Sequence, residues 1–170
     1  GKDALEATTT ASNNTAVGYQ SLTANTTGHS NTALGTSAGA AITTGNYNVA
    51  VGRNSLDACT TAESNTAVGW TSLGAVTTGA GNTGIGSDAG AAITTGANNT
   101  IMGYLAGDAI TTADANTAIG KSALSATTTA DANTAVGFQA LNTATTAANN
   151  TAAGHNALFN ATTGAGNVAI

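Results

Sequence analysis

The sequence predicts an all-β fold, a β-solenoid or β-roll of ten coils with 17 residues in each. A segment resembling Asn-Thr-Ala-Val-Gly recurs every 17 residues along the whole chain, and a fixed period of this kind is the signature of a repeat architecture. Thr, Asn and Gly, which are abundant, form helices poorly. The chain also lacks the Asn-Gly, Asp-Gly and Gly-Gly dipeptides typical of tight hairpins. Stacked parallel coils therefore fit better than helices or a hairpin meander.

We number the columns of the repeat from 1 to 17, starting at its invariant Asn. One array fills residues 1–170: a partial unit at 1–13, units starting at 14, 31, 48, 65, 82, 99, 116, 133 and 150, and a partial unit at 167–170. Coils about 4.8 Å apart would make a rod roughly 48 Å long. The Asn side chains of column 1 are expected to hydrogen-bond into a ladder along the axis. They are Asn14, Asn31, Asn48, Asn65, Asn82, Asn99, Asn116, Asn133, Asn150 and Asn167.

Three other columns do not vary among the units. Column 5 is always Gly, which indicates a positive φ or a close approach of another backbone. Columns 13 and 14 are always a Thr pair. Column 12 is apolar in most units, and neighbours in a strand point to opposite sides, so only one Thr of each pair is expected to point outward.

Two features of the apolar pattern predict the core. Column 4 is aliphatic nearly throughout, and we expect it to face inward; it comprises Val17, Leu34, Val51, Val68, Ile85, Met102, Ile119, Val136 and Ile170, with Ala153 as the small exception. Columns 9 and 12 exchange volume, because Gly in column 9 is always accompanied by Ile in column 12 and Leu never is. We expect these two columns to share one pocket, since close-packed interiors respond to single methylene groups.

Charged residues make up 6% of the chain and mark the surface. The three cations, Lys2, Arg53 and Lys121, all lie in column 6, and the acids lie only in columns 7, 10 and 16. These four columns are expected to face water. Column 6 also contains aromatic residues, which we interpret as possible surface contacts with neighbouring chains or with sugars: Tyr19, Trp70, Tyr104 and Phe138.

Composition also argues against several classes of partner. A net charge of −5 disfavours nucleic acid, whose binding depends on neutralising phosphates. The long uncharged stretches are broken by Thr, Asn and Ser and do not predict insertion into a membrane. The single cysteine, Cys59, falls in the apolar column 12, so we interpret it as a small buried group rather than a reactive thiol.

The sequence predicts no enzyme, no metal site and no cofactor. Gly35–Gly39 matches G-x-S-x-G, but the repeat offers no strand-turn-helix context for that motif. His29 and His155 lie in different columns several coils apart, too distant to share a metal within one chain. No phosphate-binding, dinucleotide-binding or calcium-repeat motif is present.

The units Asn14–Ser30 and Asn133–Asn149 closely resemble the NTAxGxxAL…TTG repeats of phage-type tail-fibre proteins and related bacterial surface proteins. A more distant resemblance links them to the β-roll heads of trimeric autotransporter adhesins. The resemblance implies an extracellular, elongated and homotrimeric fibre on a virion or cell surface. Thin coils bury little surface on their own, which independently favours association of several chains.

Our interpretation from sequence is therefore a fibre shaft that provides rigidity and reach for surface attachment. Self-association is expected as a homotrimer, by head-to-tail stacking, or both, because joining Ile170 (column 4) to Gly1 (column 5) would continue the repeat. Two alternatives remain open. Rows of Thr could bind ice, and the aromatic residues of column 6 could make the rod bind cell-surface glycans.

Overall fold

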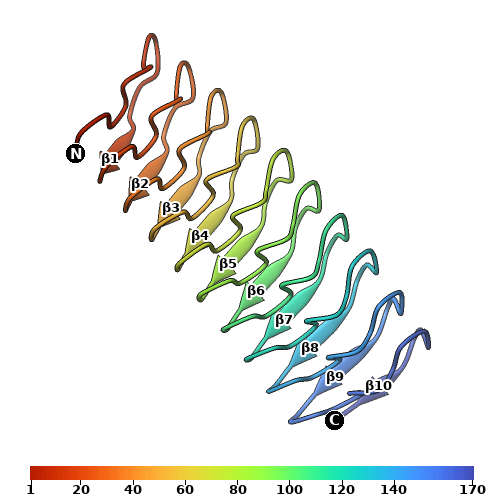
Figure 1. The fold of residues 1–170 in the computed structure, drawn as a ribbon. Coiled ribbons are helices and arrows are strands. Elements are labelled where there is room, and N and C mark those ends of the chain that lie inside the picture. The colour runs from red at the N-terminus through yellow and green to blue at the C-terminus, as the bar shows by residue number, and fades with distance from the viewer.

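The computed structural model describes residues 1–170 as stacked coils joined by one parallel sheet of ten short strands (Figure 1). The strands are β1 (Thr15–Val17), β2 (Thr32–Leu34), β3 (Val49–Val51), β4 (Thr66–Val68), β5 (Thr83–Ile85), β6 (Thr100–Met102), β7 (Thr117–Ile119), β8 (Thr134–Val136), β9 (Thr151–Ala153) and β10 (Val168–Ala169). Each strand pairs with the next at a shift of 17 residues, as where Thr15 lies opposite Thr32. The predicted all-β solenoid with 17-residue coils is confirmed. No helix capable of crossing a membrane occurs.

The asparagines of column 1 connect every pair of neighbouring coils. The side-chain Oδ1 of Asn31 accepts a hydrogen bond from the backbone N–H of Asn48 at 2.9 Å and from its Nδ2 at 3.2 Å. The backbone part of this contact recurs at all nine steps from Asn14 to Asn167, at 2.8–3.0 Å. From Asn31 to Asn150 the side chains are buried. A buried amide is costly unless its hydrogen bonds are satisfied, and this arrangement satisfies them along the axis.

The glycines of column 5 are required at the corner that follows each strand. Gly69 has φ 138°, and a Cβ built on it would lie 2.3 Å from the carbonyl oxygen of Gly86 in the next coil. Both expectations for this column are therefore correct, because the corner has a positive φ and also a close backbone approach. Since the same contact recurs from coil to coil, any larger residue would push neighbouring coils apart.

Three further columns adopt left-handed backbone, and these were not foreseen. Columns 7, 9 and 17 have φ near +55°, as at Gln20 (55°), Leu22 (50°) and Ser30 (58°). Asn and Asp, which recur in columns 7 and 17, tolerate this region better than most residues. Leucine does not, and its use in column 9 indicates that packing outweighs local strain there.

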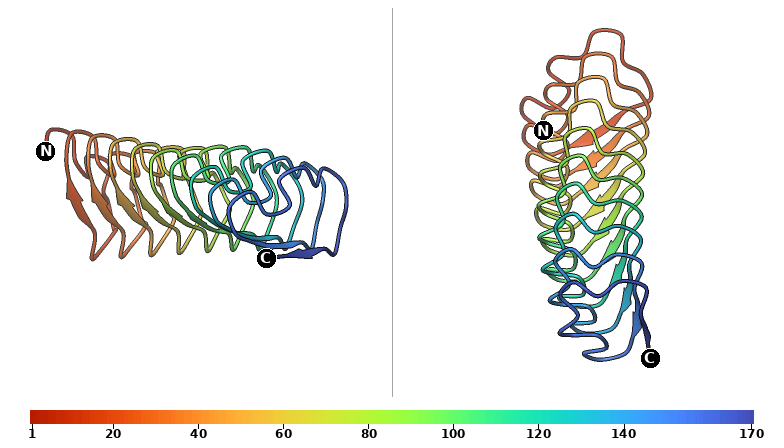
Figure 2. Two further views of the ribbon diagram at one scale, coloured as in Figure 1. Left: turned by 90° about the horizontal axis from the view of Figure 1, so that it is seen from below. Right: turned by 90° about the vertical axis from the view of Figure 1, so that its right-hand side faces the viewer.

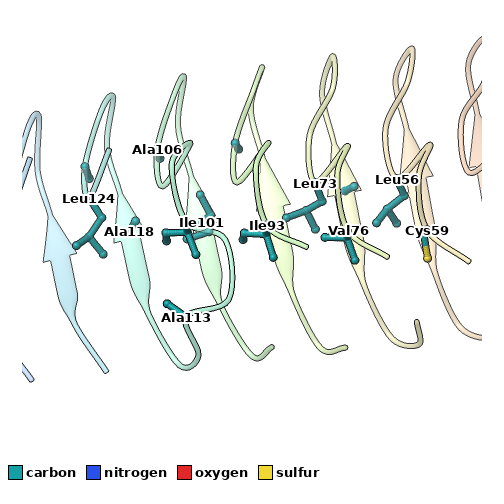
Figure 3. Close-up of a cluster of buried hydrophobic side chains, with 14 of the residues drawn as sticks. Leu56, Cys59, Leu73, Val76, Ile93, Ile101, Ala106, Ala113, Ala118 and Leu124 are labelled. Atoms are coloured by element: carbon teal, nitrogen blue, oxygen red, sulfur yellow. The ribbon is translucent and has the colours of Figure 1, made fainter. Parts of the chain in front are cut away.

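The interior is a narrow file of side chains from columns 3, 8, 9, 12 and 15 (Figure 3). Columns 9 and 12 share one pocket, as predicted: a Cβ on Gly39 would lie 2.9 Å from Cδ1 of Ile42. Column 3 also takes part in the exchange of volume. A Cβ on Gly84 would lie 2.7 Å from Cγ of Leu73 in the preceding coil, whereas Ile101 follows a coil that has Gly90 in column 9.

Candidate functional site: the outer strand face

Each strand turns one residue inward and two outward. In β2, Ala33 is fully buried, whereas Thr32 and Leu34 on either side of it are exposed. The expectation that column 4 forms the core is therefore wrong. The physical reason is that Leu of column 9 and Ile of column 12 already fill the space beneath the strands, so that in most coils column 3 holds a small residue. The aliphatic residue of column 4 then lies outside by strand alternation.

We call the surface formed by columns 2 and 4 the outer strand face. Column 2 contributes Thr15, Thr32, Val49, Thr66, Thr83, Thr100, Thr117, Thr134, Thr151 and Val168, and column 4 contributes Val17, Leu34, Val51, Val68, Ile85, Met102, Ile119, Val136 and Ala153. No charged residue lies on it. Val17 is 53% exposed, Leu34 49% and Met102 41%. The face is thus a continuous, uncharged band of threonine and aliphatic side chains.

The outer strand face winds about the axis. Figure 2 shows the strands changing direction gradually from β1 to β10, as twisted sheets normally do. The face is therefore regular from one coil to the next, but it does not stay in one plane over the length of the rod.

The Thr pair separates as predicted, with one member pointing outward. The hydroxyl of Thr43 in column 13 donates to the carbonyl of Thr60 in the next coil at 3.1 Å, and the same bond recurs along most of the array. Column 14, represented by Thr44, is exposed in every coil. The first Thr therefore links neighbouring coils, while the second has no side-chain role within the chain.

Column 6 faces water in nearly every coil, and part of it forms a stack along the axis. The Nζ of Lys121 lies 5.8 Å from the ring centre of Tyr104 and 5.9 Å from that of Phe138. The ring of His155 stacks on Phe138 with centroids 5.3 Å apart and planes 9° from parallel. These contacts turn the ring faces along the axis rather than toward a ligand.

The other predicted aromatic contacts are separate from this stack. Tyr19 and Trp70 are 45% and 54% exposed, and no other ring or cation stacks on them. A further exposed aromatic residue, Tyr47 in column 17, meets the His29 ring edge-on at 5.0 Å. Sequence reasoning did not single out Tyr47, because column 17 has no charged residue to mark it as exposed.

Ser37 and the ionisable side chains are spread over several columns of the repeat. Ser37, the central residue of the G-x-S-x-G match, lies at φ 55° in a turn that no helix follows. Nowhere do three His, Cys, Asp or Glu side chains gather as metal ligands would, and the surface has no pocket. Cys59 is fully buried, and loss of hydration raises the pKa of its thiol to about 11. Partial burial also raises the pKa of Asp57 and of Asp108, the latter helped by the negative charge of Asp88.

The acidic column 16 continues the axial pattern of side-chain bonds. Asp131 accepts the backbone N–H of Asp114 at 2.8 Å, and Asp114 accepts that of Ala97 at 2.7 Å. Both carboxylates remain exposed. This column lies before the strand and the cationic column 6 lies after it, so opposite charges border the outer strand face.

Comparison of the chain with protein-family models, curated proteins and solved structures finds no match.

Proposed function

We propose that this chain is a structural shaft, a rigid spacer within an extracellular fibre or filament of a virion or cell surface. The observation that carries the proposal is the unbroken ten-strand ladder, in which every step has the same 17-residue register. Asn and Thr bonds reinforce the same direction, because both join a coil to its neighbour. Such a body resists bending and holds its two ends apart, which is what a shaft requires.

Self-association belongs to this proposal. Lateral assembly as a homotrimer would thicken the shaft, and head-to-tail stacking would lengthen it. In this proposal the chain itself contributes rigidity and reach, and the attachment it supports is made to cell surfaces, with glycans as the partner class. Tyr19 and Trp70 are the side chains best placed for such contact, since their rings have no stacking partner within the chain.

Electron microscopy tests the shaft. The array of residues 1–170 is compared with a tandem duplication in which Gly1 of a second copy follows Ile170. We expect straight rods roughly 48 Å long for the single array, from a coil spacing of about 4.8 Å, and rods of twice that length and equal width for the duplication. Compact particles, or rods that kink at the junction, would refute a stiff shaft.

A second candidate is ice binding, and one observation favours it. The Thr hydroxyls of column 2 make no hydrogen bond within the chain and form a row along the solenoid axis, across the strands, as at Thr66, Thr83 and Thr100. The winding of the face (Figure 2) opposes this function, because a crystal plane is flat. Thermal hysteresis distinguishes the two candidates: depression of the freezing point at micromolar protein, abolished by Thr83→Lys, would favour ice.

A further inference from the structure

We propose that the outer strand face is the surface through which copies of this chain pack side by side, parallel and with equal coils level. This inference rests on the proposed shaft and names the residues of its lateral contact. The face of one copy would turn toward the common axis of the assembly, and each copy would meet two neighbours around that axis.

The distribution of exposed apolar groups points to this face. Every large hydrophobic residue that the chain leaves exposed lies in column 2, 4 or 6, except Tyr47. Contiguous exposed apolar surface on a soluble protein marks an interaction site more often than chance would allow. Because the outer strand face lacks charge throughout, burying it against another surface leaves no charged side chain without a partner.

The dimensions suit a second copy. A band two strand positions wide, with its side chains, measures roughly 10 Å across and 48 Å along the axis, about 500 Å² for each copy. In a ring of three copies the bands bury about 1,500 Å² in all but only about 500 Å² for each pair of neighbours, which is below the roughly 1,000 Å² of a specific pairwise interface, so the ring is expected to form as a whole rather than through a stable dimer. The rows repeat at the coil spacing and wind with the sheet. A second solenoid of the same sequence has the same repeat and the same winding, so copies that coil gently around each other keep their rows in contact over the full length.

Charge complementarity sets the orientation. Column 6, after the strands, has all three cations, with Asp3 and Asp88 beside it in column 7, and column 16, before the strands, has three acids and no cation. In a parallel ring of copies, the cationic edge of one chain meets the acidic edge of the next. Two units hold both partners, one with Arg53 and Glu63 and the other with Lys121 and Asp131, and all four side chains are exposed. Rim pairs of this kind add little affinity but fix register and direction.

The first test measures association by light scattering and sedimentation over a range of concentrations. The wild type is expected to form a defined oligomer that Leu34→Asp and Val136→Asp weaken at least tenfold, because each places a charge in the dry contact. The matched control is Thr78→Asp in column 14, which is exposed away from the face and should not change the association. A monomeric wild type, or equal weakening by the control, would overturn the proposal.

The second test reads direction and register without relying on affinity. In a Cys59→Val background, Val51→Cys in β3 and Val136→Cys in β8 lie equally far from the midpoint of the ten-strand sheet, between β5 and β6. With a short bis-maleimide reagent, parallel level copies should cross-link Val51→Cys only to itself. Antiparallel copies would instead give the mixed product with Val136→Cys, and that result would refute the arrangement. Arg53→Glu should weaken association and Glu63→Arg should restore it in the double variant.

The two proposals fail separately. If micrographs show straight rods while scattering finds single chains at every concentration, the lateral contact is wrong and the shaft stands. If no rods form, the shaft itself is wrong.

Discussion

Replacing Asn25 by valine is expected to stabilise the protein. Asn25 lies in column 12 with its side chain fully buried, and its Oδ1 has no hydrogen-bond partner. Its Nδ2 donates to the carbonyl of Gly28 at 3.2 Å, but that oxygen also accepts a 2.7 Å bond from Nδ2 of Asn14. The Gly28 carbonyl therefore remains paired after the substitution. The neighbouring Leu22 then has the same partner that Leu73 has in Val76.

The magnitude follows from three contributions. Removing a buried carbonyl without a partner gains about 1–3 kcal/mol, and losing the bond to Gly28 costs about 1 kcal/mol. Two buried methyl groups in place of the amide add about 1.5 kcal/mol. The net gain in the free energy of unfolding is therefore about 2 kcal/mol, which corresponds to a rise of about 4–8 °C in Tm for a chain of this length.

Urea unfolding followed by circular dichroism measures the effect of Asn25→Val. The midpoint should rise with an unchanged slope, because the surface exposed on unfolding is the same. The matched control is Asn48→Val, which removes a buried amide whose Nδ2 donates to Asn31 and to the carbonyl of Ala62 and whose Oδ1 accepts the backbone N–H of Asn65. It should lower stability by about 3 kcal/mol. A lower midpoint for Asn25→Val would refute the reasoning that Oδ1 is orphaned.

Three further predictions follow from the core and from the buried ionisable groups. Gly69→Ala should destabilise far more than Gly154→Ala in thermal melts, because both have φ near 135° but only Gly69 faces a backbone 2.3 Å from a new Cβ; equal losses would assign the effect to φ alone. With the thiol pKa of Cys59 raised from 9.0 to about 11, unfolded chains ionise first as pH rises, so wild type should lose stability between pH 9 and 11 relative to Cys59→Val. Burial raises the pKa of Asp108, so its ionised form costs stability above that pKa, and Asp108→Asn should raise Tm at pH 7 but not at pH 3; an equal rise at both pH values would assign the effect to something other than charge.

Much of the fold was predictable because the repeat reports the same position ten times. The period predicted the coil length and the parallel register. The exchange of small and large residues between columns 9 and 12, as at Gly39 and Ile42, predicted the pocket that the two columns share. The invariant Asn column indicated an axial ladder for a physical reason: a side chain that recurs in every coil lies beside its own copy in the next coil. These inferences depended on comparing columns rather than on the propensity of any one residue.

The error over column 4 came from treating apolar character as evidence of burial. Which side chains of a three-residue strand point inward depends on the space available beneath the strand. Here a leucine of column 9, such as Leu73, already fills that space. A signal was present in the sequence, because column 3 is nearly always Ala or Gly, as expected for a position against a filled interior. The threonines of column 2 share their side with column 4, so both columns were candidates for the surface. The left-handed backbone at Leu22 gave no such signal, since leucine rarely adopts it.

The constant spacing of the contacts has a genetic consequence. Strand register and the Asn and Thr bonds along the axis join residues 17 apart, so most coils hold no information about their own place in the array. The coil of Ile101 is an exception, because the coil before it has the small Gly90 in column 9. Excising residues 65–81 would bring Asn82 onto Asn48 with every neighbour relation restored. Unequal recombination between the repeats could then lengthen or shorten the protein by whole coils, in steps of about 4.8 Å. Each product would keep the solenoid fold wherever the newly joined coils fit together.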